Sequence, residues 1–151
     1  LKMPTRWFVG CDHAGLGLKR ALVTMLRGLG DQVDDLGTSE ETSVDYPDYA
    51  KKVADTIAQG KAELGVLVCG TGIGMSISAN KVRGVRAAVC RTEFEARMAR
   101  AHNDANVLCL GQRVTGSGLA RAILEAFVGG KFEVGRHAMR VDKIVAQDAR
   151  R

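Results

Sequence analysis

The sequence predicts one α/β domain in which a five-stranded parallel sheet is covered by helices on both faces. Short apolar segments rich in Val and Leu alternate with longer amphipathic segments of helical periodicity along the chain. The length of 151 residues suits one domain with a core that needs no disulfides. Because neither an internal repeat nor a dividing linker interrupts this alternation, we expect residues 1–151 to form one three-layer unit.

The amino-terminal part is expected to supply two strands and two helices. The apolar segment Arg6–Cys11 predicts the first strand, and leucines at helical spacing predict a helix over 16–29 that ends at glycines. The short segment 32–36 has a weaker strand pattern and is expected near a sheet edge. After a polar loop over 37–47, the apolar pattern predicts an amphipathic helix over 48–59.

A central strand and a glycine-rich turn come next. The run Leu64–Val68 is typical of a strand buried on both faces. Glycines at positions 70, 72 and 74 then lead into a short helix from Met75 to Asn80. A strand, turn and helix in this order point backbone N–H groups at an anion, and the glycines let a ligand approach the backbone closely.

The carboxyl-terminal half continues the alternation. In chain order we expect a strand over 86–90, a helix over 92–101 capped by Thr92, a strand over 105–110, a helix over 115–128, and a basic tail from about residue 131 that is helical from about Arg136.

The glycine-rich turn does not match the common phosphate-binding motifs. A P-loop carries Lys and Ser or Thr after its last glycine, where this chain has Met75, and a dinucleotide fingerprint has the spacing G-x-G-x-x-G. A cysteine phosphatase would have an arginine at position 75. What remains is an anion-binding turn that begins at the thiol of Cys69 and contains no Lys or Arg, which suits an oxyanion developing on carbon. The alternative is a structural turn with a buried cysteine.

Polar side chains follow three of the predicted strands. Asp12 and His13 follow the first strand, Cys69 the central one and Arg113 the last. Because parallel strands end at one edge of the sheet, we expect these residues to meet in one crevice, although Asp12 could simply cap a helix. We expect His102, just ahead of the last strand, to face the same crevice.

Composition limits the partners. The net charge is +5, but basic residues do not alternate with aromatic ones, so a nucleic-acid partner is not expected. The apolar runs are too short to cross a bilayer, so no membrane partner is expected. Arg136 and Arg140 lie four apart on one helical face, where they form either a solvated surface or, with His137 between them, a phosphate site.

Cysteine and histidine spacing argues against a metal site. The four cysteines form no C-x-x-C pair, and the three histidines form no H-x-x-x-H motif. Free thiols without a secretory segment indicate a reducing, cytoplasmic location. Met3 is a candidate for the native start, since Leu1 and Lys2 precede it.

Six segments together resemble ribose-5-phosphate isomerase B, whose superfamily includes the galactose-6-phosphate isomerase subunits. They are GCDHAG (10–15), DYP (45–47), CGTGIGMSISANK (69–81), VRA (85–87), HNDANVL (102–108) and GQRV (111–114). The resemblance extends over nearly the whole chain. One branch of this family lacks the cysteine and has a glutamate at the position of Met75, so the chain resembles the cysteine branch.

The resemblance implies a cofactor-free aldose–ketose isomerase with a Rossmann-like fold, acting on a phosphorylated sugar as a homodimer or tetramer with shared active sites. It also implies residue roles. Cys69 would move the proton between C2 and C1, Thr71 would assist at the substrate oxygens, His102 would open the furanose ring, and Asp12 would lie on the opposite side of the sugar. The substrate contacts would include Cys11, Gly70, Gly72, Ile73, Gly74 and Asn103, with Arg113, Arg136, Arg140 and His13 at the phosphate.

The exact substrate stays open. Ribose 5-phosphate is the favoured substrate, and galactose 6-phosphate, allose 6-phosphate and a tetrose phosphate are alternatives, since these isomerases share catalytic residues. A non-catalytic phosphosugar- or nucleotide-binding module is the alternative of a different class. The tail from about residue 131 is expected to pack on the partner subunit.

Overall fold

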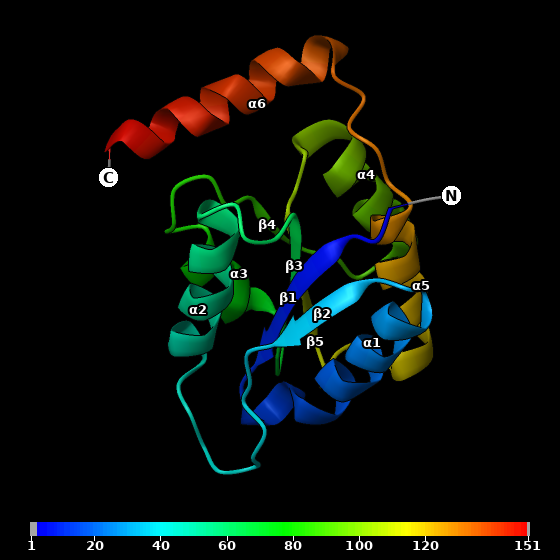
Figure 1. The fold of residues 1–151 in the computed structure, drawn as a ribbon. Coiled ribbons are helices and arrows are strands. Elements are labelled where there is room, and N and C mark those ends of the chain that lie inside the picture. Colours follow the sequence, from blue (N-terminus) through cyan, green and yellow to red (C-terminus); the bar gives the residue numbers. More distant parts are fainter. Residues whose placement is uncertain (1–2, 151) are drawn as a thin grey trace.

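The computed structural model describes residues 3–150, so Leu1 and Lys2, which precede the candidate start at Met3, lie outside it. Figure 1 shows strands and helices alternating along this chain. The strands are β1 (Arg6–Cys11), β2 (Gln32–Asp35), β3 (Leu64–Cys69), β4 (Ala87–Val89) and β5 (Val107–Gly111). The helices are α1 (Leu16–Gly28), α2 (Tyr46–Ala58), α3 (Ile73–Ala79), α4 (Glu93–Asn103), α5 (Ser117–Val128) and α6 (Gly135–Gln147), with 3-10 turns at His13–Gly15 and Asp148–Arg150.

All strand pairs are parallel, in the order β2-β1-β3-β5-β4. The expected five-stranded parallel sheet is therefore confirmed, with β2 at an edge. Cys11 pairs with Val68, and Cys69 pairs with Gly111, so β1, β3 and β5 end at the same level. This register brings the segments that follow these three strands to one edge of the sheet.

Each face of the sheet has its own apolar core. Alternate residues of a strand point to opposite faces, so Val66 and Val68 pack with α1, α4 and α5, while Leu67 and Cys69 pack with α2 and α3. The side chain of Cys69 therefore lies on the α2–α3 face. Helices cover both faces, and this confirms the three-layer architecture (Figure 1).

Local sequence signals explain several helix boundaries. Helix α4 begins with a capping box in which Thr92 accepts the N–H of Glu95 at 3.1 Å and the Glu95 carboxylate accepts the N–H of Thr92 at 3.2 Å. Helix α2 begins at Tyr46, two residues earlier than expected, because proline fits the first turn of a helix and Pro47 occupies it. Helix α4 extends to Asn103, two residues beyond its expected end, so His102 and Asn103 form its last turn.

Helix α6 contacts the rest of the chain near its two ends, where His137 stacks on His102 of α4 and Asp148, just after the helix, accepts the N–H of Gly84 at 2.9 Å. In Figure 1 it extends beyond the end of α4, on the side of the sheet where the strands begin. His137 and Val141 are its buried residues, whereas Met139 is 67% and Ile144 is 42% exposed. Its helical start at Gly135 agrees with the expected one, and its packing on a partner subunit stays a prediction. None of the described helices combines the length and apolar character needed to cross a membrane.

Candidate active site

An open cleft of about 530 Å³ lies at the carboxyl ends of β1, β3 and β5. It brings together Asp12 and His13 after β1, Cys69 and the glycine-rich turn after β3, and Arg113 after β5, as the parallel topology predicts. The complete lining consists of Asp12, His13, Ala14, Tyr46, Cys69, Gly70, Thr71, Ile73, Gly74, Ile77 and Arg113.

Cys69 is held at the base of this cleft by the turn that follows it. Its side chain is 5% exposed, and its Sγ accepts the N–H of Gly72 at 3.1 Å. This hydrogen bond fixes the sulfur relative to the backbone of the turn. Gly72 has a φ of 80°, and an added Cβ would lie 3.0 Å from the backbone of Leu110, so glycine is needed here for both conformation and space.

The rest of the turn forms one wall of the cleft. The Oγ1 atom of Thr71, an exposed residue, accepts the N–H of Ile73 at 3.2 Å. An added Cβ at Gly74 would lie 2.3 Å from the ring of Tyr46, so the phenol packs directly over this glycine. Tyr46 therefore contributes to the cleft, although the sequence pattern assigned it no role in the site. The signal for it is an aromatic residue immediately before the proline that opens α2.

Asp12 and His13 are fixed by backbone N–H groups. The Asp12 carboxylate accepts the N–H of Ala14 at 2.9 Å and caps the following 3-10 turn, so its alternative role as a cap is real, while the residue also lines the cleft. The Nδ1 atom of His13 accepts the N–H of Val44 at 3.1 Å. This bond assigns the proton of the neutral ring to Nε2.

A buried lysine anchors the loop that holds His13. Lys19 is 1% exposed, and its Nζ lies 2.8 Å from a carboxylate oxygen of Asp35 and donates to the carbonyl of Thr38 at 2.7 Å. Both partners are at the start of the loop that later reaches Val44. Lys19 lies four residues before Val23, on the buried side of α1. This spacing indicates a buried lysine, but this signal in the sequence was missed.

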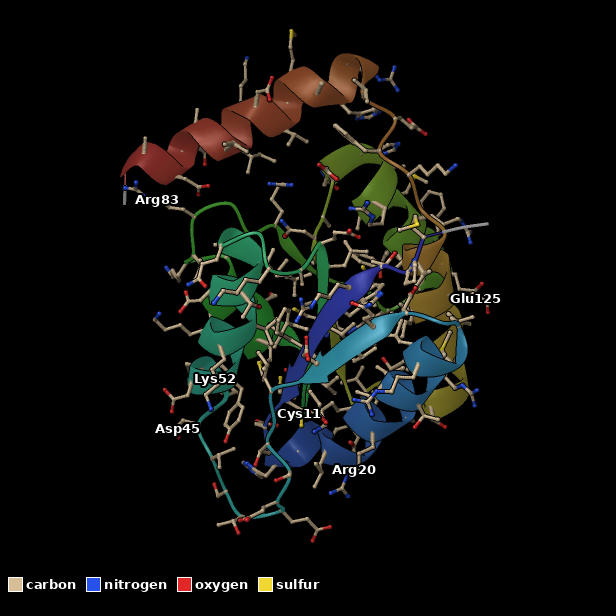
Figure 2. The ribbon with its side chains drawn as sticks, viewed as in Figure 1. Cys11, Arg20, Asp45, Lys52, Arg83 and Glu125 are labelled. Carbon is tan, nitrogen blue, oxygen red and sulfur yellow. The ribbon has the colours of Figure 1, made fainter. Side chains whose placement is uncertain are left out.

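Cys11 lies outside the cleft, contrary to its expected role as a substrate contact. The alternation of β1 places its side chain in the core below Asp12, 3.7 Å from the carbonyl of Thr38. Burial raises the pKa of this thiol to about 11, although nearby Lys19 opposes the rise. In Figure 2, Cys11 is labelled at the end of β1, next to the loop after β2.

His102 does not face the cleft of its own chain, so that expectation was wrong. His102 ends a helix that precedes β5, so it lies near the amino end of this strand, whereas Cys69 lies at the carboxyl end of the neighbouring strand. The four residue steps from Gly65 to Cys69 alone span roughly 13 Å. Asn103, Arg136 and Arg140 are absent from the cleft lining as well, since they belong to α4 and α6.

A second polar cluster forms around His102 at this opposite edge. The rings of His102 and His137 stack in parallel, with centroids 4.1 Å apart and an interplanar angle of 7°. The Glu133 carboxylate lies 3.7 Å from Nε2 of His102 and 3.5 Å from Nε2 of His137. Desolvation and the neighbouring His102 ring lower the pKa of His137.

Comparison with known proteins identifies the family. The sequence model of the ribose/galactose isomerase family matches residues 8–144. The chain belongs to the ribose/galactose isomerase family. This membership confirms the resemblance found in the motifs and the expected isomerase class of enzyme.

Similar members of the ribose/galactose isomerase family cover almost the whole chain. The chain is 47% identical over 142 residues to ribose-5-phosphate isomerase B of Escherichia coli, covering 94% of this chain and 95% of that protein. It is also similar to the solved structure of ribose-5-phosphate isomerase B from Clostridium thermocellum, with a TM-score of 0.95, 47% identity, and coverage of 96% of this chain and 98% of that one. The type B enzyme of Trypanosoma brucei has a TM-score of 0.92 and 45% identity, with coverage of 95% and 99%.

This member of the ribose/galactose isomerase family has a thiol in the cleft and no acidic residue in α3. The Met75 side chain is fully buried in the core on the α2–α3 face. A methionine has no ionisable group, so it cannot act as a base from this position. Cys69 is consequently the cleft residue on β3 that can exchange a proton after ionisation.

Proposed function

We propose that this chain interconverts D-ribose 5-phosphate and D-ribulose 5-phosphate through an enediolate, without a cofactor. The observation that carries the proposal is the Cys69 thiol, which accepts the Gly72 N–H at 3.1 Å inside a cleft between three strand ends. Two of the similar proteins carry the name ribose-5-phosphate isomerase B, which supports the same substrate.

Cys69 acts as the base in this mechanism. Its thiolate takes the proton from C2 of the open-chain aldose and returns it to C1, while a proton moves from the C2 hydroxyl to the carbonyl oxygen at C1. The carbonyl group thereby passes from C1 to C2, and no electron acceptor is needed. The Gly72 N–H holds the thiolate before and after the transfer.

The backbone of the turn stabilises the charge that develops on the sugar oxygens. A C–H proton next to a carbonyl is weakly acidic, so the enediolate needs donors that are already in place. One donor of this kind lowers the activation free energy by about 3 kcal/mol. The N–H groups of Gly72 and Ile73 already bond to Cys69 and Thr71, so the other N–H groups of the turn between Gly70 and Gly74 serve as these donors. Thr71, at the exposed rim, assists at the same oxygens, and Asp12 lies across the sugar from the ring-opening histidine.

A second subunit completes each site. His102 is too far from Cys69 in one chain to act on the same sugar, and Arg136 and Arg140 are exposed on α6 at the same distant edge. We therefore assign His102 to ring opening, and Asn103, Arg136 and Arg140 to substrate binding, in the cleft of a partner in a homodimer or a tetramer of dimers. His13 and Arg113 hold the phosphate from the side of the Cys69 chain.

A substrate screen tests the reaction. Purified protein is incubated with ribose 5-phosphate, allose 6-phosphate, galactose 6-phosphate and a tetrose phosphate, and ketose formation is followed without added metal or nucleotide. We expect the highest kcat/KM on ribose 5-phosphate. Faster turnover of another phosphosugar would reassign the substrate within the family. Binding of phosphosugars without any turnover would support the non-catalytic binding module instead.

A further inference from the structure

Three potential metal ligands meet at the edge of the sheet opposite the Cys69 cleft. Nε2 of His102, a carboxylate oxygen of Glu133 and Nε2 of His137 come from α4, the α5–α6 connection and α6, respectively. The ligand atoms of these three residues all lie within 4.8 Å of one another. The two nitrogen–oxygen distances, 3.7 and 3.5 Å, are close to the separation of about 3.4 Å between ligands of a tetrahedral zinc ion.

The backbone holds these three residues together. The N–H of Glu133 donates to the carbonyl of Ala101 at 3.0 Å, which fixes the connection next to His102. Val134 then has a φ of 57°, a rare conformation for a β-branched residue, and this turn starts α6 so that His137 returns over Glu133. On α4, a guanidinium nitrogen of Arg100 donates to a carboxylate oxygen of Asp104 at 3.2 Å, and this bond fixes the last turn of the helix, which carries His102.

The chemistry of the donors selects a transition-metal ion. Two imidazoles and one carboxylate match the ligand set of open zinc sites, in which a fourth position takes water or a substrate atom. Magnesium and calcium prefer oxygen ligands and do not suit this cluster. In the single chain, the side chain of His102 is 36% and that of Glu133 is 57% exposed.

We propose that His102, Glu133 and His137 bind Zn²⁺, and that the bound ion inhibits the isomerase by occupying the imidazole needed for ring opening. A metal lies in the plane of each imidazole that it binds, so the stacked rings must turn apart when the ion enters. The side chain of His102 is half-buried and can make this turn, and its Nε2 is then bound to the ion and cannot act on a sugar. The inhibition rests on the proposed role of His102, whereas the binding does not.

Calorimetric titration with Zn²⁺ in a buffer without thiol reductants tests the binding. The titrated protein is Cys69→Ala, so that zinc cannot bind the thiol in the cleft. We expect one Zn²⁺ per chain and no measurable binding of Mg²⁺. Glu133→Gln in the same background should weaken Zn²⁺ binding about 100-fold. Even the loss of a residue that only hydrogen-bonds to a metal ligand lowers metal affinity about 10- to 100-fold.

Two further variants make the binding result specific. Glu125→Gln removes the same negative charge as Glu133→Gln, but from α5. Figure 2 labels Glu125 far from α6, so this variant should leave the zinc affinity unchanged. His137→Gln removes a nitrogen ligand and should also weaken binding. The site is refuted if Cys69→Ala does not take up zinc, if Mg²⁺ binds equally well, or if Glu133→Gln binds zinc as tightly as its parent.

The inhibition is measured separately, on chains that keep Cys69. Wild type and Glu133→Gln should have similar activity without metal, because Glu133 is outside the proposed catalytic and binding groups. We expect Zn²⁺ to inhibit wild type at concentrations at least tenfold lower than those needed for Glu133→Gln, and EDTA to restore activity. Equal sensitivity of the two proteins would overturn the inhibition. A wild type without isomerase activity in metal-free buffer would instead contradict the proposed function, and the calorimetric result would still stand.

Discussion

Mixing two inactive variants tests whether one site needs two chains. Cys69→Ala removes the proposed base at the carboxyl edge, and His102→Asn removes the proposed ring-opening group at the amino edge, at least roughly 13 Å away along the strands. A heterodimer of these variants has one site with both defects and one site with neither. We therefore expect activity to return when subunits exchange.

The recovered activity has a defined upper limit. At equal concentrations and random exchange, half of the dimers are heterodimers, and each of these has one intact site of two, so activity should approach about one quarter of the wild-type value. The assay follows ketose formation from ribose 5-phosphate before and after exchange, and native mass spectrometry measures the heterodimer fraction. Mixing either variant with itself provides the control. A heterodimer fraction near one half without recovery would show that Cys69 and His102 act within one chain.

Three substitutions within one chain test the cleft and its support. Cys69→Ala should lower kcat more than a thousandfold while leaving substrate binding, measured by calorimetry, nearly unchanged; near-normal turnover would exclude its role as the base. Gly74→Ala should reduce kcat/KM at least tenfold because the new methyl group displaces Tyr46, whereas Gly118→Ala, with open space around it, should have no effect. Lys19→Met should lower the free energy of unfolding by about 3 kcal/mol in urea titrations, since it removes two bonds to a buried charge. Lys51 is exposed, so Lys51→Met should lower the free energy of unfolding by at most about 0.5 kcal/mol. Equal losses of stability in the two variants would contradict a special role for the buried Lys19.

The sheet and its active edge were predictable because they depend on local patterns. Apolar runs located four strands and a weaker pattern located β2, and the rule that parallel strands end together brought Asp12, His13, Cys69 and Arg113 into one cleft. The cap at Thr92 was predictable for the same reason, and the structure adds its capping-box partner Glu95, three residues away.

The errors concern relations between segments. In a parallel sheet, a residue just before β5 lies at the edge opposite the cleft, so chain order alone gives the position of His102. The expectation that His102 lies near Cys69 came instead from its expected role in the chemistry, and it was wrong. Tyr46 and Lys19 were missed for another reason. Their roles depend on Gly74 and on Thr38, which are distant in sequence and approach only in the folded chain.

The placement of Cys69 and His102 at opposite edges has a consequence for mixed populations of chains. In a dimer with the proposed shared sites, each site takes one group from each chain, so a chain with both Cys69→Ala and His102→Asn damages both sites of any dimer that it enters. Wild-type chains would then lose activity although they are correctly folded. An excess of the double variant in a cell would therefore act as a dominant inhibitor, and its effect would grow with the rate of subunit exchange.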